Sequence, residues 1–237
     1  MQYFIAELIG TFLLILIGDG VVANVTLNKS GMKGAGSIQI TFAWGLAVML
    51  PAFAFGAISG AHYNPALTLA LAADGSLPWD RVPAYIAGQF IGAILGASLV
   101  YALFKDQFDA TDDKGSKLGV FCTGPSVPNT FRNLLSEIVE TFILVFMIKC
   151  TGNVAGLGDM GLNYIFVFAI IVSIGMSFGG LTGYAINPAR DLGPRIAHAI
   201  LPIQGKGDSN WGYAWIPVVG PVIGALIAVG LYAVIPW

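Results

Sequence analysis

Charged side chains are scarce in this sequence. Of its 237 residues, only 10% are Asp, Glu, Lys or Arg, less than half of the roughly 25% that soluble domains carry. The formal net charge of −2 provides no basic surface, which argues against nucleic acid as a partner. Hydrophobic residues make up 56% of the chain. This composition predicts a membrane protein that crosses the bilayer several times.

Cysteine and histidine are also rare, with two residues of each kind. Cys122 and Cys150 lie in segments of different character, and a single pair at that separation indicates neither a disulfide framework nor a metal site. The sequence contains no phosphate-binding loop, no cluster of metal ligands and no nucleophile beside a base. We therefore expect no enzyme, no cofactor and no metal. No basic segment precedes the first apolar run, so we expect that run to be retained rather than cleaved.

Six apolar runs are long enough for helices that cross a bilayer core, which needs about 20 residues. They cover residues 3–25, 38–55, 82–104, 134–151, 162–178 and 214–235. Two further apolar segments, 65–73 and 188–199, are too short to span and would reach half-way as helices. The sequence predicts an all-α membrane protein with six transmembrane helices and two re-entrant half-helices.

Both short segments begin with Asn-Pro-Ala, preceded by a turn that contains glycine. Asparagine suits the capping position before a helix, and proline suits the first helical position, where its missing N–H is no loss. The residues concerned are Asn64, Pro65, Ala66, Asn187, Pro188 and Ala189. The alternative is that these are two ordinary helix caps without a function in a pore.

The two halves of the chain align with each other. Residues 6–12 match residues 136–142, and residues 60–66 match residues 183–189, with a separation of 187 − 64 = 123 residues between the two asparagines. Three spans per half is an odd number, so the second copy enters from the opposite side, as an inverted repeat. We predict one channel domain over 1–237, with halves at about 1–104 and 134–237 and a linker at 105–133. The two Asn-Pro-Ala N-termini would then meet near the midplane.

Four acidic residues lie inside the predicted spans. Glu7 and Glu137 occupy matching positions of the repeat, which favours a structural task, namely accepting backbone N–H groups of the two re-entrant loops. The alternative for this pair is a proton relay. Glu140 belongs to one repeat only, and we assign it no role. Asp19 has no counterpart, and we place it either in a wet vestibule or at the membrane interface.

Two Asn-Pro-Ala motifs in inverted halves of six spans resemble the aquaporin superfamily, over essentially the whole chain. Within it, the segment Asn-Pro-Ala-Arg-Asp-Leu-Gly-Pro-Arg at 187–195 is similar to the form found in bacterial glycerol facilitators. There, an Asp follows the pore arginine and a basic residue comes four positions after that Asp. The resemblance implies passive diffusion of glycerol and similar small uncharged solutes, with some water. The alternative is a channel mainly for water or for protonated lactic acid, dihydroxyacetone or urea.

The resemblance also implies a pore constriction, which motif offsets place at Trp44, Gly175, Tyr184 and Arg190. Water-selective relatives typically have histidine at the Gly175 position, so glycine implies a wider pore. Tyr184 stands where phenylalanine is commonest in glycerol channels. Its hydroxyl leaves two outcomes open, a narrower constriction or a preference for a more polar solute. For Arg190, the alternative is a side chain that extends to the membrane interface.

Backbone carbonyls complete the implied pore. In the family they accept hydrogen bonds from the solute, and here they belong to Gly60, Ala61, His62, Gly183, Tyr184 and Ala185. We expect the His62 ring to be structural, with a gating role as the alternative, and we expect Asp191 to support its loop. The positive ends of the half-helices, together with Arg190, would exclude protons and cations.

The resemblance further implies a homotetramer in the cell membrane, with both termini cytoplasmic. Most basic residues lie in the first and third connections, which the positive-inside rule would place in the cytoplasm. The resemblance places these connections outside, and we follow it. Two other classes stay open, an ion-driven secondary transporter and an adhesive or structural membrane protein.

Overall fold

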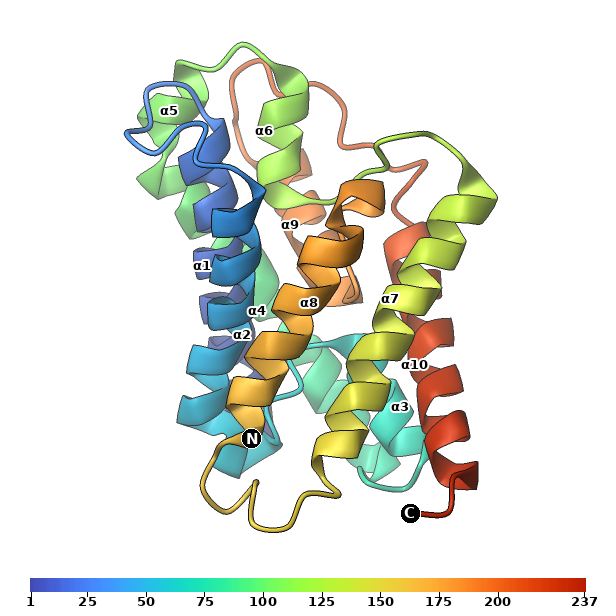
Figure 1. The fold of residues 1–237 in the computed structure, drawn as a ribbon. Coiled ribbons are helices and arrows are strands. Elements are labelled where there is room, and N and C mark those ends of the chain that lie inside the picture. The colour runs from blue at the N-terminus through green and yellow to red at the C-terminus, as the bar shows by residue number, and fades with distance from the viewer.

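The structure is a computed structural model that describes residues 1–237, and it is helical throughout, without a strand. Six long helices stand side by side (Figure 1). They are α1 (Gln2–Thr26), α2 (Ser37–Ser59), α4 (Val82–Leu103), α7 (Thr130–Thr151), α8 (Asn163–Thr182) and α10 (Ile216–Val234). Two shorter helices, α3 (Pro65–Ala73) and α9 (Pro188–Ile200), lie among them. The predicted architecture of six spans and two half-helices is confirmed.

Five of the long helices are apolar and long enough to cross a membrane, and α7 is the exception. Its 22 residues suffice in length, but they include Arg132, Glu137, Glu140 and Lys149. Both glutamates are buried within the protein. The polar character of α7 therefore belongs to its inward face and its two ends, where it is compatible with a membrane span.

The two half-helices point in opposite directions within the bundle. Figure 1 shows α3 running toward the end of the molecule that carries both chain termini, and α9 running toward the other end. The loops before them, 60–64 and 183–187, therefore meet in the middle of the bundle. The termini share one side, as an even number of spans requires.

Two helix pairs approach each other closely through glycine. A Cβ atom on Gly92 of α4 would lie 2.2 Å from the carbonyl oxygen of Leu8 in α1. A Cβ atom on Gly224 of α10 would lie 2.1 Å from the carbonyl oxygen of Ile138 in α7. Only glycine permits this close backbone contact. In lipid, helices associate through such packing, because the burial of apolar surface gives no driving force there.

The segment 105–133 is more ordered than a linker. It contains α5 (Lys105–Asp109) and α6 (Lys114–Phe121), and α6 packs against α1 and α9. Helix α7 begins at Thr130 rather than at 134, because the side chain of Asn129 caps it by accepting from the backbone N–H of Arg132. A short turn of 3-10 helix, η1 (Trp79–Arg81), precedes α4. The division of the chain into two repeats stays a prediction.

Candidate pore and its lining

Each half-helix begins with an asparagine cap, as the motif predicts. The side-chain oxygen of Asn64 accepts from the backbone N–H of Ala66 at 2.9 Å. The side-chain oxygen of Asn187 accepts from the backbone N–H groups of Ala189 at 3.0 Å and Arg190 at 3.2 Å. Proline follows both asparagines at the first helical position. The caps hold the amide nitrogens at the point where the two helix N-termini meet.

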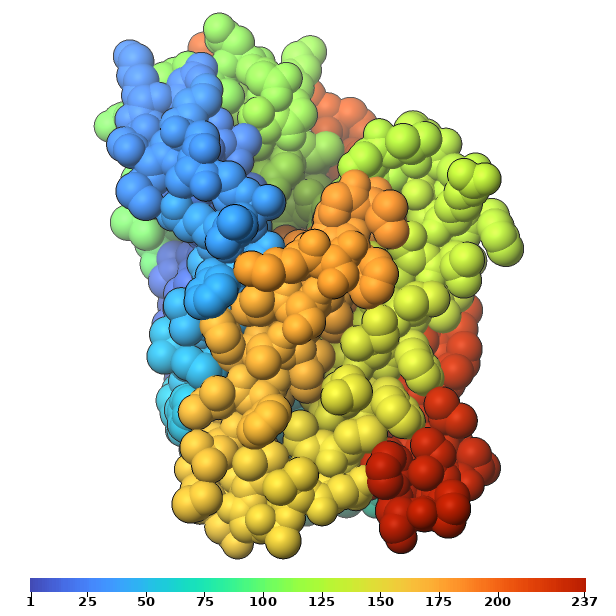
Figure 2. Space-filling view, in the orientation of Figure 1, coloured from blue at the N-terminus to red at the C-terminus, as the bar shows by residue number.

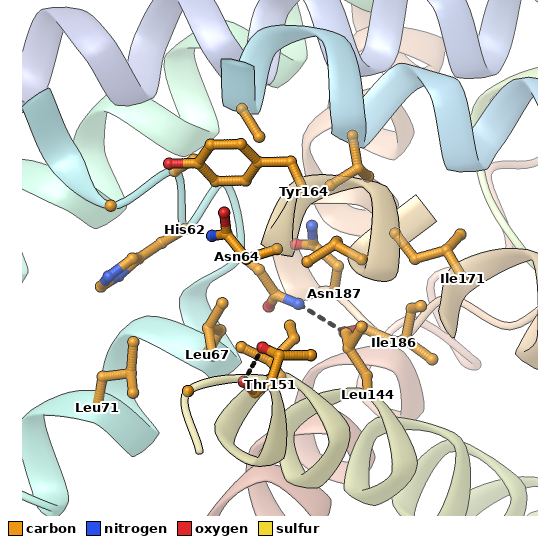
Figure 3. Close-up of a pocket in the computed structure, with 18 of the residues that line it drawn as sticks. His62, Asn64, Leu67, Leu71, Leu144, Thr151, Tyr164, Ile171, Ile186 and Asn187 are labelled. Carbon is orange, nitrogen blue, oxygen red and sulfur yellow. Dashed lines mark hydrogen bonds between the residues drawn. The ribbon is translucent and has the colours of Figure 1, made fainter. Parts of the chain in front are cut away.

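The two asparagines also exchange hydrogen bonds between the loops. The amide nitrogen of Asn64 donates to the carbonyl of Ile186 at 2.8 Å, and that of Asn187 donates to the carbonyl of Tyr63 at 2.8 Å. Figure 3 shows Asn64 and Asn187 next to each other, with a dashed line from Asn64 to Ile186. An amide nitrogen carries two hydrogens. Each asparagine therefore keeps one donor for a solute in the cavity that both line.

The two re-entrant loops have the same backbone conformation. Positive φ angles occur at Gly60 (81°), Ala61 (55°) and Tyr63 (49°), and at the matching positions Gly183 (88°), Tyr184 (39°) and Ile186 (47°). Left-handed backbone is rare outside glycine and costs energy unless its surroundings impose it. Three carbonyls of each loop accept no hydrogen bond within the protein, and their residues line the cavities. They are those of Gly60, Ala61, His62, Gly183, Tyr184 and Ala185.

Glu7 holds the first loop. Its carboxylate is fully buried and accepts from the backbone N–H groups of His62 at 3.1 Å and Tyr63 at 2.7 Å. It also accepts from the side chains of Ser59 at 2.6 Å and Gln89 at 2.7 Å. These four donors are fixed, and Glu7 lines neither cavity. This is the contact pattern of a structural anchor.

Glu137 holds the second loop in the same way. It accepts from the backbone N–H groups of Ala185 at 3.0 Å and Ile186 at 2.9 Å, and from the hydroxyl of Thr182 at 2.7 Å. It too is fully buried and lines neither cavity. The backbone donors to Glu137 stand 123 residues after those to Glu7. Each half of the chain therefore uses a buried glutamate to hold its own re-entrant loop.

Two cavities lead toward the centre from opposite ends. The first, of about 500 Å³, extends from the asparagine pair to the loop after α7, which contributes residues between Thr151 and Asp159. Figure 2 shows this loop packed along the end of the molecule below α8. The second, of about 650 Å³, is bounded by the start of α2 and by residues 119–124. Trp44, Tyr184 and Arg190 line both cavities, so they mark the boundary between them.

At this boundary Arg190 packs against Trp44, and Tyr184 packs against Gly175. The guanidinium carbon of Arg190 lies 3.9 Å from the centre of a Trp44 ring. A Cβ atom on Gly175 would lie 2.9 Å from the Tyr184 ring and 2.6 Å from the methyl group of Thr41. Gly175 therefore makes room for Tyr184 and Thr41, and the space beside it is filled by them.

The family model described as Major intrinsic protein matches residues 1–232 of the chain. This chain belongs to the major intrinsic protein family. It is 58% identical to the glycerol uptake facilitator protein of Bacillus subtilis, over 94% of this chain and 81% of the relative. It is 52% identical to a probable glycerol uptake facilitator protein of Thermotoga maritima, over 98% of both chains. The solved structure of the aquaglyceroporin from Plasmodium falciparum superimposes with a TM-score of 0.85 at 29% identity, over 99% of this chain and 96% of that one.

The effect of the Tyr184 hydroxyl on the constriction and on solute preference stays a prediction. In this member of the major intrinsic protein family, the Tyr184 hydroxyl is buried and has no hydrogen-bond partner. Its ring lies against Gly175 and Gly179 of α8. The hydroxyl is therefore not exposed to either cavity, although Tyr184 lines both.

Asp191 ties α9 to the segment after α6. Its carboxylate accepts from the backbone N–H of Thr123 at 2.8 Å, from the Thr123 hydroxyl at 2.7 Å and from the Nε of Arg195 at 2.9 Å. Arg195 in turn donates to the carbonyl of Thr123 at 3.0 Å. The sequence gives no local signal for Thr123 as a partner, because the contact joins residues 68 positions apart.

The His62 ring turns away from the asparagine pair, as Figure 3 shows. One ring nitrogen lies 3.1 Å from the Thr68 hydroxyl, and the ring packs 4.8 Å from that of Tyr85. The first cavity is also lined by apolar side chains, which include Leu67, Leu144 and Ile171 (Figure 3). The cavity lining therefore combines hydrogen-bonding groups with apolar side chains.

Asp19 lies in neither of the places that the sequence indicated. Its side chain is fully buried and lines neither cavity, so it is in no wet vestibule and not at an interface. One carboxylate oxygen lies 3.5 Å from a guanidinium nitrogen of Arg190. The local sequence does not predict this contact, since it joins two residues from opposite halves of the chain.

Proposed function

We propose that this chain forms a passive channel for glycerol and similar small uncharged solutes, with water as a lesser permeant. The observation that carries the proposal is the pair of cavities that meet at Trp44, Tyr184 and Arg190, whose lining combines residues with free carbonyls and apolar side chains. The names of the relatives, several of them glycerol uptake facilitators, support the same solute.

A small polyol matches this lining. Its hydroxyl groups donate to the six unpaired loop carbonyls, which replace the water that the solute leaves behind. They accept from the second hydrogen of Asn64 and Asn187 and from Arg190. Its carbon atoms pass along Trp44 and the apolar side chains, where only contact is required. Selectivity then rests on width and on the placement of donors and acceptors, and no covalent step is involved.

Ions and protons are excluded by the same parts. Both half-helices direct their N-termini at the asparagine pair, and a helix N-terminus carries a partial positive charge. Arg190 adds a full positive charge at the boundary between the cavities. A cation at the centre therefore meets a repulsive field and finds no compensating negative ligand. Transport is thus driven by the solute gradient alone.

We extend the proposal to the protein's surroundings. Large apolar side chains exposed on the long helices, such as Phe42, Leu95 and Ile227, support contact with lipid or with neighbouring copies. We propose a homotetramer with one pore per subunit in the cell membrane. We also propose that the end of the molecule with both termini faces the cytoplasm.

The test is a flux assay on the purified protein in liposomes. Vesicles are mixed with iso-osmotic glycerol, and their swelling is followed by light scattering, with empty vesicles as the control. We expect glycerol permeability well above the control, and a lower preference for urea, dihydroxyacetone or lactic acid at low pH. Glycerol flux equal to that of empty vesicles contradicts the proposal. Accumulation against a gradient that an uncoupler abolishes identifies a secondary transporter instead.

A further inference from the structure

Asp19 is a fully buried acidic residue without a hydrogen bond to either of its carboxylate oxygens. A carboxylate removed from water requires compensation by a positive charge or by donors. The cation within ion-pair distance is Arg190, whose guanidinium nitrogen lies 3.5 Å away. Asp19 lines neither cavity, whereas Arg190 lines both.

Arg190 is held by few other groups. Its Nη1 atom donates to the carbonyl of Phe121 at 3.4 Å, which is long for a hydrogen bond. The guanidinium carbon lies over the Trp44 ring. Asp191, the next residue, does not pair with it, because both oxygens of Asp191 are engaged by Thr123 and Arg195. Asp19 is thus the carboxylate that faces the guanidinium.

The backbone beside Asp19 also fixes Trp44. A Cβ atom on Gly18 would lie 2.3 Å from two atoms of the Trp44 ring, so the ring lies directly on the α1 backbone. The Trp44 ring contacts the Gly18 backbone, and Arg190 rests over the same ring. The pair Gly18 and Asp19 therefore sets the position of both large side chains at the boundary between the two cavities.

We propose that Asp19 is a positioning residue that sets the solute specificity of the channel through Arg190. Its carboxylate draws the guanidinium back against Trp44, so that the guanidinium lines the solute's path without blocking it. Without it, the guanidinium moves into the constriction, which obstructs glycerol more than the smaller water molecule. This inference rests on the proposed function and concerns the same site.

The test is a double-mutant cycle in liposomes, with wild type, Asp19→Asn, Arg190→Ala and the double variant. Asparagine keeps the size of the side chain and removes its charge. We expect Asp19→Asn to lower the ratio of glycerol to water permeability about threefold or more, and to leave it unchanged when Arg190 is already alanine. Glu140→Gln, which alters another buried and unpartnered carboxylate, serves as the matched control and should leave the ratio unchanged.

If Asp19→Asn leaves the ratio of glycerol to water permeability unchanged, the inference is overturned. It is also overturned if Asp19→Asn changes this ratio by the same factor in the Arg190→Ala background as in the wild type. If Asp19→Asn alone does not fold, recovery in the double variant supports the pair, since the unpaired arginine is then the cause. If Arg190→Ala folds but the double variant does not, the inference is contradicted. Absence of glycerol flux in the wild type would overturn the proposed function instead. The water permeability of the four proteins then still measures the coupling.

Discussion

The residues at the boundary between the cavities depend on contacts with their neighbours as much as on their own chemistry. Gly175 illustrates this, because its missing side chain is what lets the Tyr184 ring lie beside Thr41. Tyr184 in turn lines both cavities while its hydroxyl is buried. Any side chain at 175 therefore acts on the constriction by displacing Tyr184.

Replacing Gly175 by histidine should reduce glycerol permeability more than water permeability. The new side chain begins 2.6 Å from the Thr41 methyl group and 2.9 Å from the Tyr184 ring, so it drives the ring toward the lumen, and the larger solute is obstructed first. Light scattering on liposomes gives both permeabilities. Gly230→Ala, where an added Cβ meets nothing within 4 Å, is the control. Equal losses for the two solutes would place Gly175 away from the constriction.

Some of these positions are predictable from the chain and others are not. Trp44, Tyr184 and Arg190 are positions that the resemblance to the aquaporin superfamily implies for the constriction, and all three line both cavities. Thr41 and Asp19 do not follow from it. Each reaches the site through a contact between distant segments, and no local pattern distinguishes it from any other residue on its helix.

At the scale of elements, the half-helices α3 and α9 depend on anchors outside themselves. Their loops carry left-handed backbone at non-glycine positions, and Glu7 and Glu137 accept the N–H groups that this conformation directs inward. The bounds of α3 are predictable because Asn64 and Pro65 define its start. The apolar pattern predicts a start of α7 at 134, four residues after its actual start at Thr130. The first turn is largely polar, and the capping residue Asn129 lies in the polar segment 105–133.

Glu137→Gln should destabilise the protein by about 1–3 kcal/mol, because a donor NH₂ group replaces an acceptor facing the N–H groups of the second loop. Thermal unfolding in detergent measures the effect. Glu140→Gln is the control on the same helix, since Glu140 accepts no hydrogen bond within the protein. If the two variants unfold at the same temperature, the bonds to Ala185 and Ile186 do not hold the loop.

At the scale of the whole molecule, two glycine-mediated helix pairs bring the elements together, α1 with α4 and α7 with α10. They occupy matching places in the two halves, and each brings a backbone carbonyl against a glycine. The composition predicts such crossings from its 31 glycines. It does not predict which helices meet, since that depends on how six similar apolar runs are arranged.

Gly92→Ala and Gly224→Ala should each destabilise the protein by about 1–3 kcal/mol or more, because the added methyl group would lie within 2.2 Å of a backbone oxygen and the helices must separate. The measurement is the unfolding temperature in detergent, together with the yield of folded protein. Gly230→Ala, in the same helix as Gly224, should behave as wild type. If either Gly92→Ala or Gly224→Ala unfolds at the wild-type temperature, the two helices that cross at that glycine are not in close backbone contact.

The exchange of amide hydrogen bonds between Asn64 and Asn187 has a consequence for assembly. Each half of the chain supplies the donor that satisfies a carbonyl of the other half, at Ile186 and at Tyr63. A half made alone would leave its central carbonyl and its asparagine unmatched in the middle of a membrane. The last folding step must therefore close both loops at once. A chain cut within 105–129 should form a conducting channel only when its two pieces are produced in the same cell.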